Sequence, residues 1–348
     1  MSPEAALGPW PIDGLQSVPT CPLCGSAERE LVHKDMTDLL YFCAPGEWTL
    51  FRCAQCRSGY LDPMPTPETL SLAYQTYYTH ETTAPAAAGA MATLRKSATN
   101  GYRNLRFGTK DRPGPRVFGA LVPRLTPAWA TTMDWECRHL PKPKAGMRLL
   151  DVGSGNGHFL DFARKCGWQV AGVDLDEQAV AAGRSRGLDI RNGTIEAIGA
   201  DEQFDGITMG HVIEHVFDPH ALLAACYQRL KPGGWIWVDT PNIDSLGHAQ
   251  YGPHWIGVDA PRHLILFTPA SLTDALNKAG FVNHERLHAK LAATYNWAAS
   301  ESVAAGKGMG GADEYRASVK QPAMEAVGRE MADPDVREWL TVRAYKPA

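Results

Sequence analysis

The glycine-rich segment at residues 149–160 constrains the fold of this chain more than any other part of the sequence. An apolar run ends at Asp151, glycines follow at positions 153, 155 and 157, and a helix-like segment comes next. Glycine lets a backbone turn sharply and approach a ligand that a Cβ atom would push away. The segment therefore predicts a buried strand, a turn that holds a nucleotide-like cofactor, and the start of a helix.

The residues around this turn distinguish between the possible cofactors. A dinucleotide-binding fingerprint would carry its third glycine at position 158, where the chain has His158. A G-x-G-x-G turn after Asp151 suits a cofactor that has no phosphate and a cationic amino-acid end, because its ammonium and sulfonium gain from an acidic neighbour. Asp174 closes an apolar run 21 residues after Gly153, the separation that one helix and a return strand require, so it is placed to bind ribose hydroxyls. S-adenosylmethionine fits this pattern, and a structural glycine loop is the alternative.

Three later segments extend the pattern in the order of a known family. Residues 204–209, 211–219 and 230–238 are similar to the fourth strand, the segment after it and the turn into the fifth strand of class I S-adenosylmethionine-dependent methyltransferases. The chain resembles this family from about residue 146 to its C-terminus. The resemblance implies an α/β fold in which helices cover both faces of a Rossmann-like, seven-stranded sheet.

The resemblance also assigns roles at the cofactor site. It implies that Asp151 and the glycine turn meet the methionine end of the cofactor, that Asp174 meets the ribose, and that the loop at residues 193–196 meets the adenine. The expected cofactor-binding residues are Asp151, Gly153, Ser154, Gly155, Gly157, Phe159, Asp174, Leu175, Thr194, Ile195, Gly210 and His211.

Two C-x-x-C pairs near the N-terminus, Cys21 with Cys24 and Cys53 with Cys56, form a separate motif. In a reducing cytosol such pairs more often bind metal than form disulfides, and a redox function is the alternative. Four thiolates complete a closed tetrahedral zinc site with no position left for water, so we expect the zinc to be structural. The alternating residues 48–52 predict short antiparallel strands. The pattern is typical of a zinc ribbon.

The chain divides into three parts. We expect a zinc ribbon and a following helix at residues 1–79, a linker and helical cover at residues 80–145, and the S-adenosylmethionine-binding domain at residues 146–348, with inserts at about 242–267 and 297–336. The helix after the ribbon should start near Pro67, and another helix should start at Pro269 with Thr268 as its cap. The basic segment 95–116 is either a solvated helix face or a contact for an anionic substrate.

Charge and hydropathy narrow the range of partners. A formal net charge of −4 gives no general attraction to polyanions, so nucleic acid is disfavoured as a substrate. No stretch approaches the ~18 apolar residues of a membrane span, and the first ten residues lack the basic start and apolar core of a leader. We therefore expect a soluble, cytoplasmic protein with a small-molecule or glycan-like acceptor. The sequence predicts no oligomeric state.

Several histidines stand in segments that should face the transferred methyl group. Methyl transfer is an in-line displacement, so the enzyme aligns the reactants and removes a proton when the acceptor is a hydroxyl. Histidine is the natural base near neutral pH. The first candidate is His263, followed by His215 and His211, and a structural histidine is the alternative at each position.

Residues 211–215 also resemble the ubiquinone-pathway O-methyltransferases, in which Glu-x-x-Glu-His contributes metal ligands. The chain has His211 in place of the first Glu, so Glu214 and His215 would form an incomplete set of ligands for a divalent cation. A packed turn before a helix capped by Asp218 is the favoured alternative. The N-terminal cysteine pairs look closer to those of bacterial methyltransferases that act on sugars, polysaccharide precursors or secondary metabolites.

Together these features predict an S-adenosylmethionine-dependent methyltransferase that methylates a hydroxyl of a small-molecule or glycan-like acceptor. Two alternatives stay open. One is an RNA methyltransferase whose zinc ribbon holds the RNA through phosphate contacts from Arg29, Lys34, Arg52 and Arg57. The other is a non-catalytic cofactor-binding partner in a complex.

Overall fold

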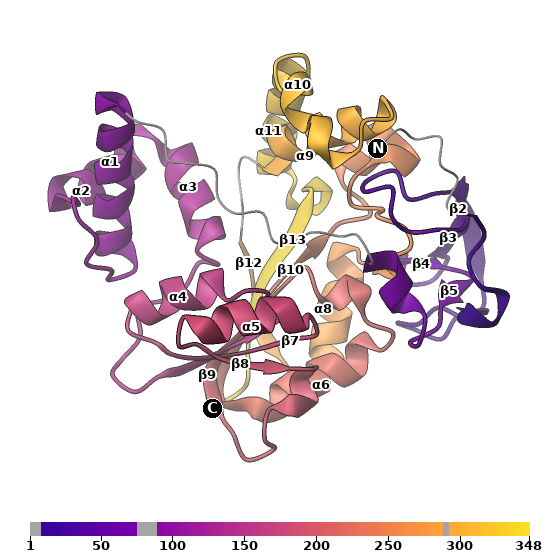
Figure 1. Cartoon of the computed structure of the whole chain (residues 1–348), viewed down its shortest axis with the longest axis horizontal. Helices are drawn as coiled ribbons and strands as arrows, with labels where there is room; N and C mark the ends of the chain where they lie inside the picture. The colour runs from indigo at the N-terminus through magenta and orange to yellow at the C-terminus, as the bar shows by residue number, and fades with distance from the viewer. Residues whose placement is uncertain (1–7, 75–88, 288–291) are drawn as a thin grey trace.

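The computed structural model describes residues 8–74, 89–287 and 292–348 of the chain. A seven-stranded sheet with the order β12-β13-β10-β9-β6-β7-β8 lies at its centre (Figure 1). The strands from β10 to β8 pair in parallel, whereas β13 is antiparallel to both β10 and β12. The seven strands are β6 Arg148–Val152, β7 Gln169–Asp174, β8 Asp189–Asn192, β9 Phe204–Gly210, β10 Leu230–Pro241, β12 Val282–Leu287 and β13 Trp339–Tyr345. This sheet confirms the predicted fold class.

Helices cover both faces of the sheet because successive side chains on each strand point to opposite faces. On β6, Leu150 packs in the larger core with Leu223 and Leu272, whereas Leu149 packs in a second core with Met133. Four helices lie between consecutive strands of this sheet in the sequence: α4 His158–Lys165, α5 Glu177–Ser185, α6 Pro219–Arg229 and α8 Pro269–Lys278.

The helix starts follow the capping residues that the sequence contains. The Thr268 side chain accepts a hydrogen bond from the Ser271 amide at 3.0 Å, and Pro269 stands at the first position of α8, as predicted. The Asp218 side chain caps α6 in the same way. The helix expected after Pro67 is a short 3-10 helix, η2, at Leu70–Tyr74.

The four-cysteine region forms a second sheet, which the catalytic part of the chain completes. Its antiparallel strands are β2 Arg29–Met36, β3 Trp48–Cys53 and β4 Gly59–Leu61, and β11 Ile265–Leu266 adds to the edge of β4. A two-stranded ladder joins β1 Leu15–Gln16 to β5 Met64–Pro65. One hydrophobic core runs from Trp48 and Tyr60 in this sheet to Ile236 and Val238 in the large one. The two sheets therefore share a core.

The remaining helices lie at two edges of the molecule (Figure 1). One edge holds α1 Ala90–Arg106, α2 Arg116–Leu125 and α3 Pro127–Glu136. The other edge holds α9 Ala292–Ala304, α10 Ala312–Tyr315 and α11 Lys320–Ala332. The first of these helices begins a few residues before the expected insert boundary at about residue 297. Shorter elements are α7 Leu246–Tyr251 and the 3-10 helices η1 Ile12–Gly14, η3 Ile195–Ala197, η4 Ile213–His215, η5 Gly252–His254, η6 Met309–Gly311 and η7 Pro334–Val336. Among the described helices, none is long and apolar enough to cross a membrane.

Candidate active site

The glycine turn after β6 leaves open space over its central residue. Gly153, Gly155 and Gly157 all have positive φ, at +69°, +51° and +80°. A Cβ atom on Gly153 would lie 2.3 Å from Cγ2 of Val212, and one on Gly157 would lie 2.5 Å from Cδ1 of Leu188, whereas one on Gly155 would meet nothing within 4 Å. Packing therefore accounts for the outer two glycines, and Gly155 faces a space that a ligand can enter.

Asp174 stands at the carboxyl end of β7, next to this turn. Its Oδ2 accepts a hydrogen bond from the Gly155 amide at 2.6 Å, and its Oδ1 accepts one from the Asp176 amide at 2.9 Å. The following side chain, Leu175, is 72% exposed. The backbone thus fixes this carboxylate beside Gly155, at the position where the resemblance predicts the ribose.

The loop expected to meet adenine lies after β8. Asn192 donates its side-chain amide to the carbonyl oxygens of Asp174 and Leu175, which joins this loop to the rim of β7. Thr194 hydrogen-bonds to Glu196, and this bond lowers the pKa of Glu196. The side chain of Ile195 packs in the core, so only its backbone is available to a base.

Asp151 is fully buried at the end of β6, behind an arginine that none of the sequence motifs contains. Its Oδ1 pairs with the guanidinium of Arg138 and accepts a hydrogen bond from Thr208 at 2.8 Å. Burial raises the pKa of Asp151 to about 6, against the opposing effects of Arg138 and Thr208. Its Oδ2 and Oγ of Ser154 are buried without a hydrogen-bond partner among the described residues. Asp151 therefore contacts Arg138 where the resemblance suggested the methionine end.

Arg138 gathers several of the predicted cofactor residues around its guanidinium. Its Cζ lies 4.3 Å from the ring centroid of Phe159 and 5.6 Å from that of Trp237. A Cβ atom on Gly210 would lie 3.7 Å from the same guanidinium. A guanidinium in this position can pair with a ligand carboxylate. No local pattern marks Arg138, because it lies outside every motif and comes to the site only through the chain's path after α3.

Glu214, which follows β9, lies at the centre of a group of three histidines. It is fully buried, accepts a hydrogen bond from Thr240 at 2.9 Å, and lies 3.3 Å from Nδ1 of His211 and 4.0 Å from Nε2 of His263. Burial would raise the pKa of Glu214, but His211, His215 and His263 outweigh it and lower the pKa to about 2. Glu214 is therefore an ionised carboxylate that faces imidazole rings.

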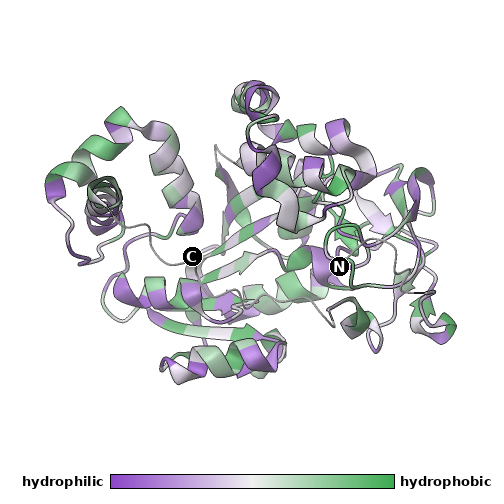
Figure 2. Ribbon diagram, turned by 45° about the horizontal axis from the view of Figure 1, so that its top comes forward, coloured by the Kyte–Doolittle hydropathy of each residue, from purple (hydrophilic) through white to green (hydrophobic). Residues whose placement is uncertain are grey.

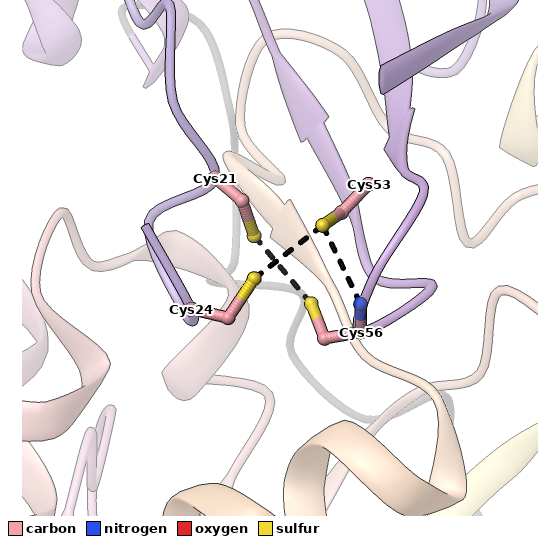
Figure 3. Close-up of side chains that lie close together, drawn as sticks. All are labelled: Cys21, Cys24, Cys53 and Cys56. Atoms are coloured by element: carbon pink, nitrogen blue, oxygen red, sulfur yellow. Dashed lines mark hydrogen bonds between the residues drawn. The ribbon is translucent and has the colours of Figure 1, made fainter. Parts of the chain in front are cut away.

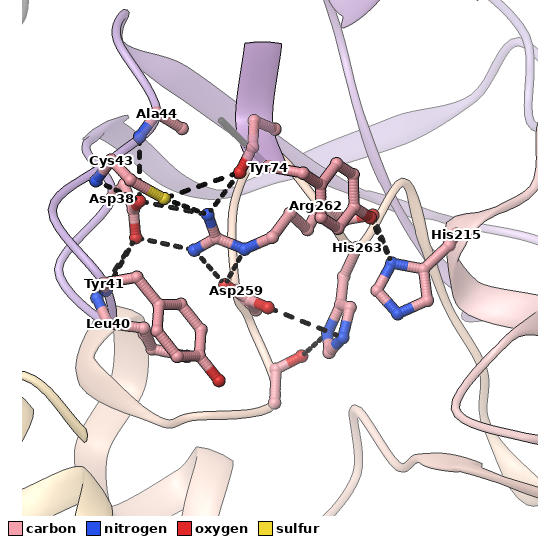
Figure 4. Close-up of polar contacts among 12 residues, drawn as sticks. Asp38, Leu40, Tyr41, Cys43, Ala44, Tyr74, His215, Asp259, Arg262 and His263 are labelled. Atoms are coloured by element: carbon pink, nitrogen blue, oxygen red, sulfur yellow. Dashed lines mark hydrogen bonds and ion pairs between the residues drawn. The ribbon is translucent and has the colours of Figure 1, made fainter. Parts of the chain in front are cut away.

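His263 and His215 meet with their rings 4.7 Å apart (Figure 4). Nδ1 of His263 lies 2.8 Å from the carbonyl oxygen of Gly257, so we assign the proton to Nδ1, which leaves Nε2 as an acceptor 3.8 Å from Asp259. Nδ1 of His215 lies 2.8 Å from the carbonyl oxygen of Arg262 and 3.0 Å from the hydroxyl of Tyr74. Burial and the neighbouring His263 lower the pKa of His215 to about 4.

His211 joins this group to the cofactor region. It adopts a left-handed φ of +54°, its ring packs edge-on against Trp339 at 4.9 Å, and its Nε2 lies 3.4 Å from Asp239. Burial would lower the pKa of His211, but the hydrogen bond to Glu214 and the charge of Asp239 raise it. Both carboxylates favour the protonated form of His211, so this histidine is less suited than His263 to accept a proton.

Arg262 fixes the segment that carries His263 to the small sheet (Figure 4). The fully buried guanidinium donates to Asp259 and to both carboxylate oxygens of Asp38, at 2.6 to 3.0 Å. It also donates to the carbonyl oxygen of Ala73. Asp38 accepts hydrogen bonds from the backbone amides of residues 40, 41, 43 and 44 and so orders the loop between β2 and β3.

The four predicted metal ligands come together at the base of β2 and β3 (Figure 3). The sulfur of Cys21 lies 3.5 Å from that of Cys56, and the sulfur of Cys24 lies 3.4 Å from that of Cys53. A disulfide would bring two sulfurs to about 2.05 Å. All four ligand atoms lie within 4.8 Å of one another, near the ~3.8 Å edges of a zinc–thiolate tetrahedron. The donor set therefore fits zinc.

Comparisons with known proteins cover the central part of the chain. Residues 133–286 match the profile of a family described as a methyltransferase domain. The chain is 34% identical over 153 residues to the ubiquinone biosynthesis O-methyltransferase of Dinoroseobacter shibae. The aligned region covers 40% of this chain and 62% of that protein. It is 31% identical over 157 residues to the protein of the same name from Thiobacillus denitrificans, with 41% and 68% covered.

Among solved structures, one that resembles the chain is phosphoethanolamine N-methyltransferase 2 of Haemonchus contortus in complex with S-adenosyl-L-methionine. It is 19% identical, covers 83% of this chain and 63% of that one, and has a TM-score of 0.43. The four cysteines and strands β2, β3 and β4 lie outside the family match, whereas β11, at the edge of the same sheet, lies inside it.

Proposed function

The chain belongs to the class I S-adenosylmethionine-dependent methyltransferases, and on that premise we propose that it transfers a methyl group to a hydroxyl oxygen of a small-molecule or glycan-like acceptor. The observation that carries the proposal is the meeting of an open glycine turn with a buried Glu214–histidine group at the carboxyl ends of neighbouring parallel strands. Ligands bind at this edge of open α/β sheets. The names of the relatives favour oxygen as the methylated atom.

The residues around the turn fit S-adenosylmethionine. Gly155 faces open space, Asp174 can accept ribose hydroxyls, and Arg138 can pair with the carboxylate of the methionine part. When bound, this cofactor supplies a methyl group on a sulfonium that is ready for in-line displacement.

The acceptor proton would go to Nε2 of His263. Its Nδ1 is held by the Gly257 carbonyl, and Glu214 and Asp259 lie within about 4 Å to stabilise the imidazolium that forms. The His215 ring lies 4.7 Å from that of His263, and Tyr74 hydrogen-bonds to His215, so these two side chains would orient the acceptor hydroxyl. His263 is 8% exposed, so water is largely kept from the base.

Glu214, His215 and His263 also form a group whose ligand atoms lie within 4.8 Å of one another. A carboxylate and two imidazoles suit a divalent cation, and the hydrogen bonds at Nδ1 of both histidines are those that orient metal ligands. A cation here would take the place of the base by lowering the pKa of the acceptor hydroxyl. Chelation distinguishes these two mechanisms, because only the second needs an exchangeable Mg²⁺ or Mn²⁺.

Label transfer from methyl-labelled S-adenosylmethionine into fractionated extracts tests the proposal. We expect label in a nuclease-resistant small-molecule or glycan fraction, and label in RNA would contradict it. His263→Ala should lower kcat by about 10²-fold to 10⁴-fold while the Kd for the cofactor changes little. His284→Gln, on β12, is the control and should behave as the wild type.

Asp174→Ala tests the cofactor site separately. It should raise the Kd for S-adenosylmethionine at least about tenfold, since one charge-assisted hydrogen bond is worth about 1.5–3 kcal/mol. Asp189→Ala, at the exposed start of β8, serves as the matched control in calorimetry. An unchanged Kd in the Asp174 variant would show that the ribose site lies elsewhere.

A further inference from the structure

The helical pair α1–α2 combines exposed apolar side chains with a concentration of positive charge. Six of the thirteen large hydrophobic side chains exposed in the described part of the chain lie between residues 90 and 125. They are Met91, Leu94, Leu105, Val117, Leu121 and Leu125, with exposed fractions from 38% to 77%. Figure 1 shows the pair at the edge of the molecule, away from the cysteine-containing sheet and from α9–α11.

The charge of this segment is opposite in sign to that of the rest of the chain. Residues 90–125 contain eight Lys and Arg and a single acid, Asp111, which gives +7 in a chain whose net charge is −4. Arg103 and Arg106 pair with acids of α3 at 3.7 and 3.4 Å. The other six, Arg95, Lys96, Lys110, Arg112, Arg116 and Arg124, form no ion pair with any residue that the structure describes.

The exposed apolar residues of α2 follow one face of the helix. Val117, Leu121 and Leu125 are spaced four residues apart, and the basic Arg116 and Arg124 stand next to this stripe. The opposite side of α2 is occupied, because Gly119 packs against Gly101 of α1. Figure 2 shows hydrophobic and hydrophilic residues side by side on the pair. The pair therefore presents an apolar stripe with a basic border.

We propose that the α1–α2 pair docks the protein on the surface of an anionic phospholipid membrane. An amphipathic helix with an apolar face and basic residues lies in the plane of the lipid headgroups, where apolar burial and attraction to anionic lipid act together. A second copy of this chain is a poorer fit, because two segments of charge +7 would repel each other. RNA is also a poorer fit, because phosphate contacts leave the exposed Leu and Met side chains in water.

Flotation with lipid vesicles tests the proposal on the full chain. We expect the protein to float with vesicles of phosphatidylcholine and phosphatidylglycerol, and to stay in solution with phosphatidylcholine alone. Salt should weaken the binding, because it screens the charges. Arg116→Gln with Arg124→Gln should reduce the partition coefficient by roughly fivefold per charge. The control is Lys320→Gln with Arg329→Gln on α11, which removes the same charge from another helix.

The apolar stripe has its own matched pair of variants. Leu121→Glu with Leu125→Glu should abolish flotation, whereas Met324→Glu with Met331→Glu, at exposed positions of α11, makes the same charge change and should leave flotation intact. Circular dichroism and cofactor affinity check that each variant is folded. The proposal is overturned by equal flotation with neutral vesicles, by an α2 variant that still floats, or by RNA binding that depends on Arg116 and Arg124 without any vesicle binding.

Discussion

At the scale of single residues, two glycines that both have positive φ separate the effects of cofactor binding from those of folding. Gly155 and Gly233 have φ of +51° and +73°, and a Cβ atom on either would meet nothing within 4 Å. Alanine at either site costs roughly 1–2 kcal/mol of backbone strain, so each variant should lower Tm by a few degrees. Only Gly155→Ala places a methyl group in the proposed cofactor space, and we expect it to raise the Kd for S-adenosylmethionine tenfold or more. Equal affinities in calorimetry would contradict this assignment.

A second residue, Glu330, makes the stability of the protein depend on pH. It is 1% exposed, and burial, with the nearby Glu338, raises its pKa to about 8. The pKa of Glu330 is higher in the folded protein than in the unfolded chain, so binding of its proton stabilises the fold. This stabilisation is complete below about pH 4.5 and is lost as pH rises through 8. Glu330→Gln should therefore raise Tm above that of the wild type near pH 8 by several degrees, with little difference near pH 4.5. Glu325→Gln, exposed on the same helix, should show no such trend in thermal melts.

Local sequence predicts some site residues and misses others for a physical reason. The glycine turn, Asp174 and the histidines stand inside continuous motifs, so the residues themselves indicate their surroundings. Arg138 and Tyr74 stand outside these motifs. Arg138 lies 13 residues before its partner Asp151, in the segment after α3, and Tyr74 lies 141 residues before its partner His215. Their roles depend on how the elements pack, which no local spacing encodes.

At the scale of elements, Arg262 joins the small sheet to the segment that carries His263. Its loss would leave Asp38 and Asp259 buried without their cationic partner. Breaking a buried ion pair costs about 3–5 kcal/mol, so Arg262→Met should lower the free energy of unfolding by that amount in denaturant titration. The exposed pair of Arg316 with Asp313 is the control, and Arg316→Met should change stability by under about 1 kcal/mol. Similar losses in the two variants would show that the Arg262 network adds little.

Capping residues predict where helices start, whereas the local sequence pattern does not predict which distant strands pair. Thr268 and Asp218 mark the starts of α8 and α6, because a side-chain oxygen and a following proline act locally. Strand β11 has only two residues, and its partner Tyr60 lies about two hundred positions earlier. Within the described residues, the helix expected near Pro67 is likewise a 3-10 helix that starts at Leu70. Short elements of this kind are fixed by the core that they cover.

At the scale of the whole molecule, the shared core makes the proposed zinc site matter for the catalytic part as well. Strand β3 carries Cys53 and pairs with β4, which in turn pairs with β11 of the catalytic part. The metal supplies much of the folding free energy of such small zinc domains. Cys53→Ser should therefore lose the zinc and lower the Tm of a single cooperative transition by about 10 °C or more. Methyl transfer should fall with it, because Asp38 would no longer hold Arg262 beside His263.

A cysteine outside the cluster provides the control for this prediction. Cys166 is buried in the core on the other face of the sheet, and Cys166→Ser should keep the zinc and lose only a small part of the stability. Zinc analysis and calorimetry on both variants distinguish two architectures. If Cys53→Ser loses zinc while the main transition keeps its Tm, the cysteine-containing sheet is an independent module. If the main transition moves with zinc content, the two sheets fold as one unit, as their common core and the buried Arg262–Asp38 pair require.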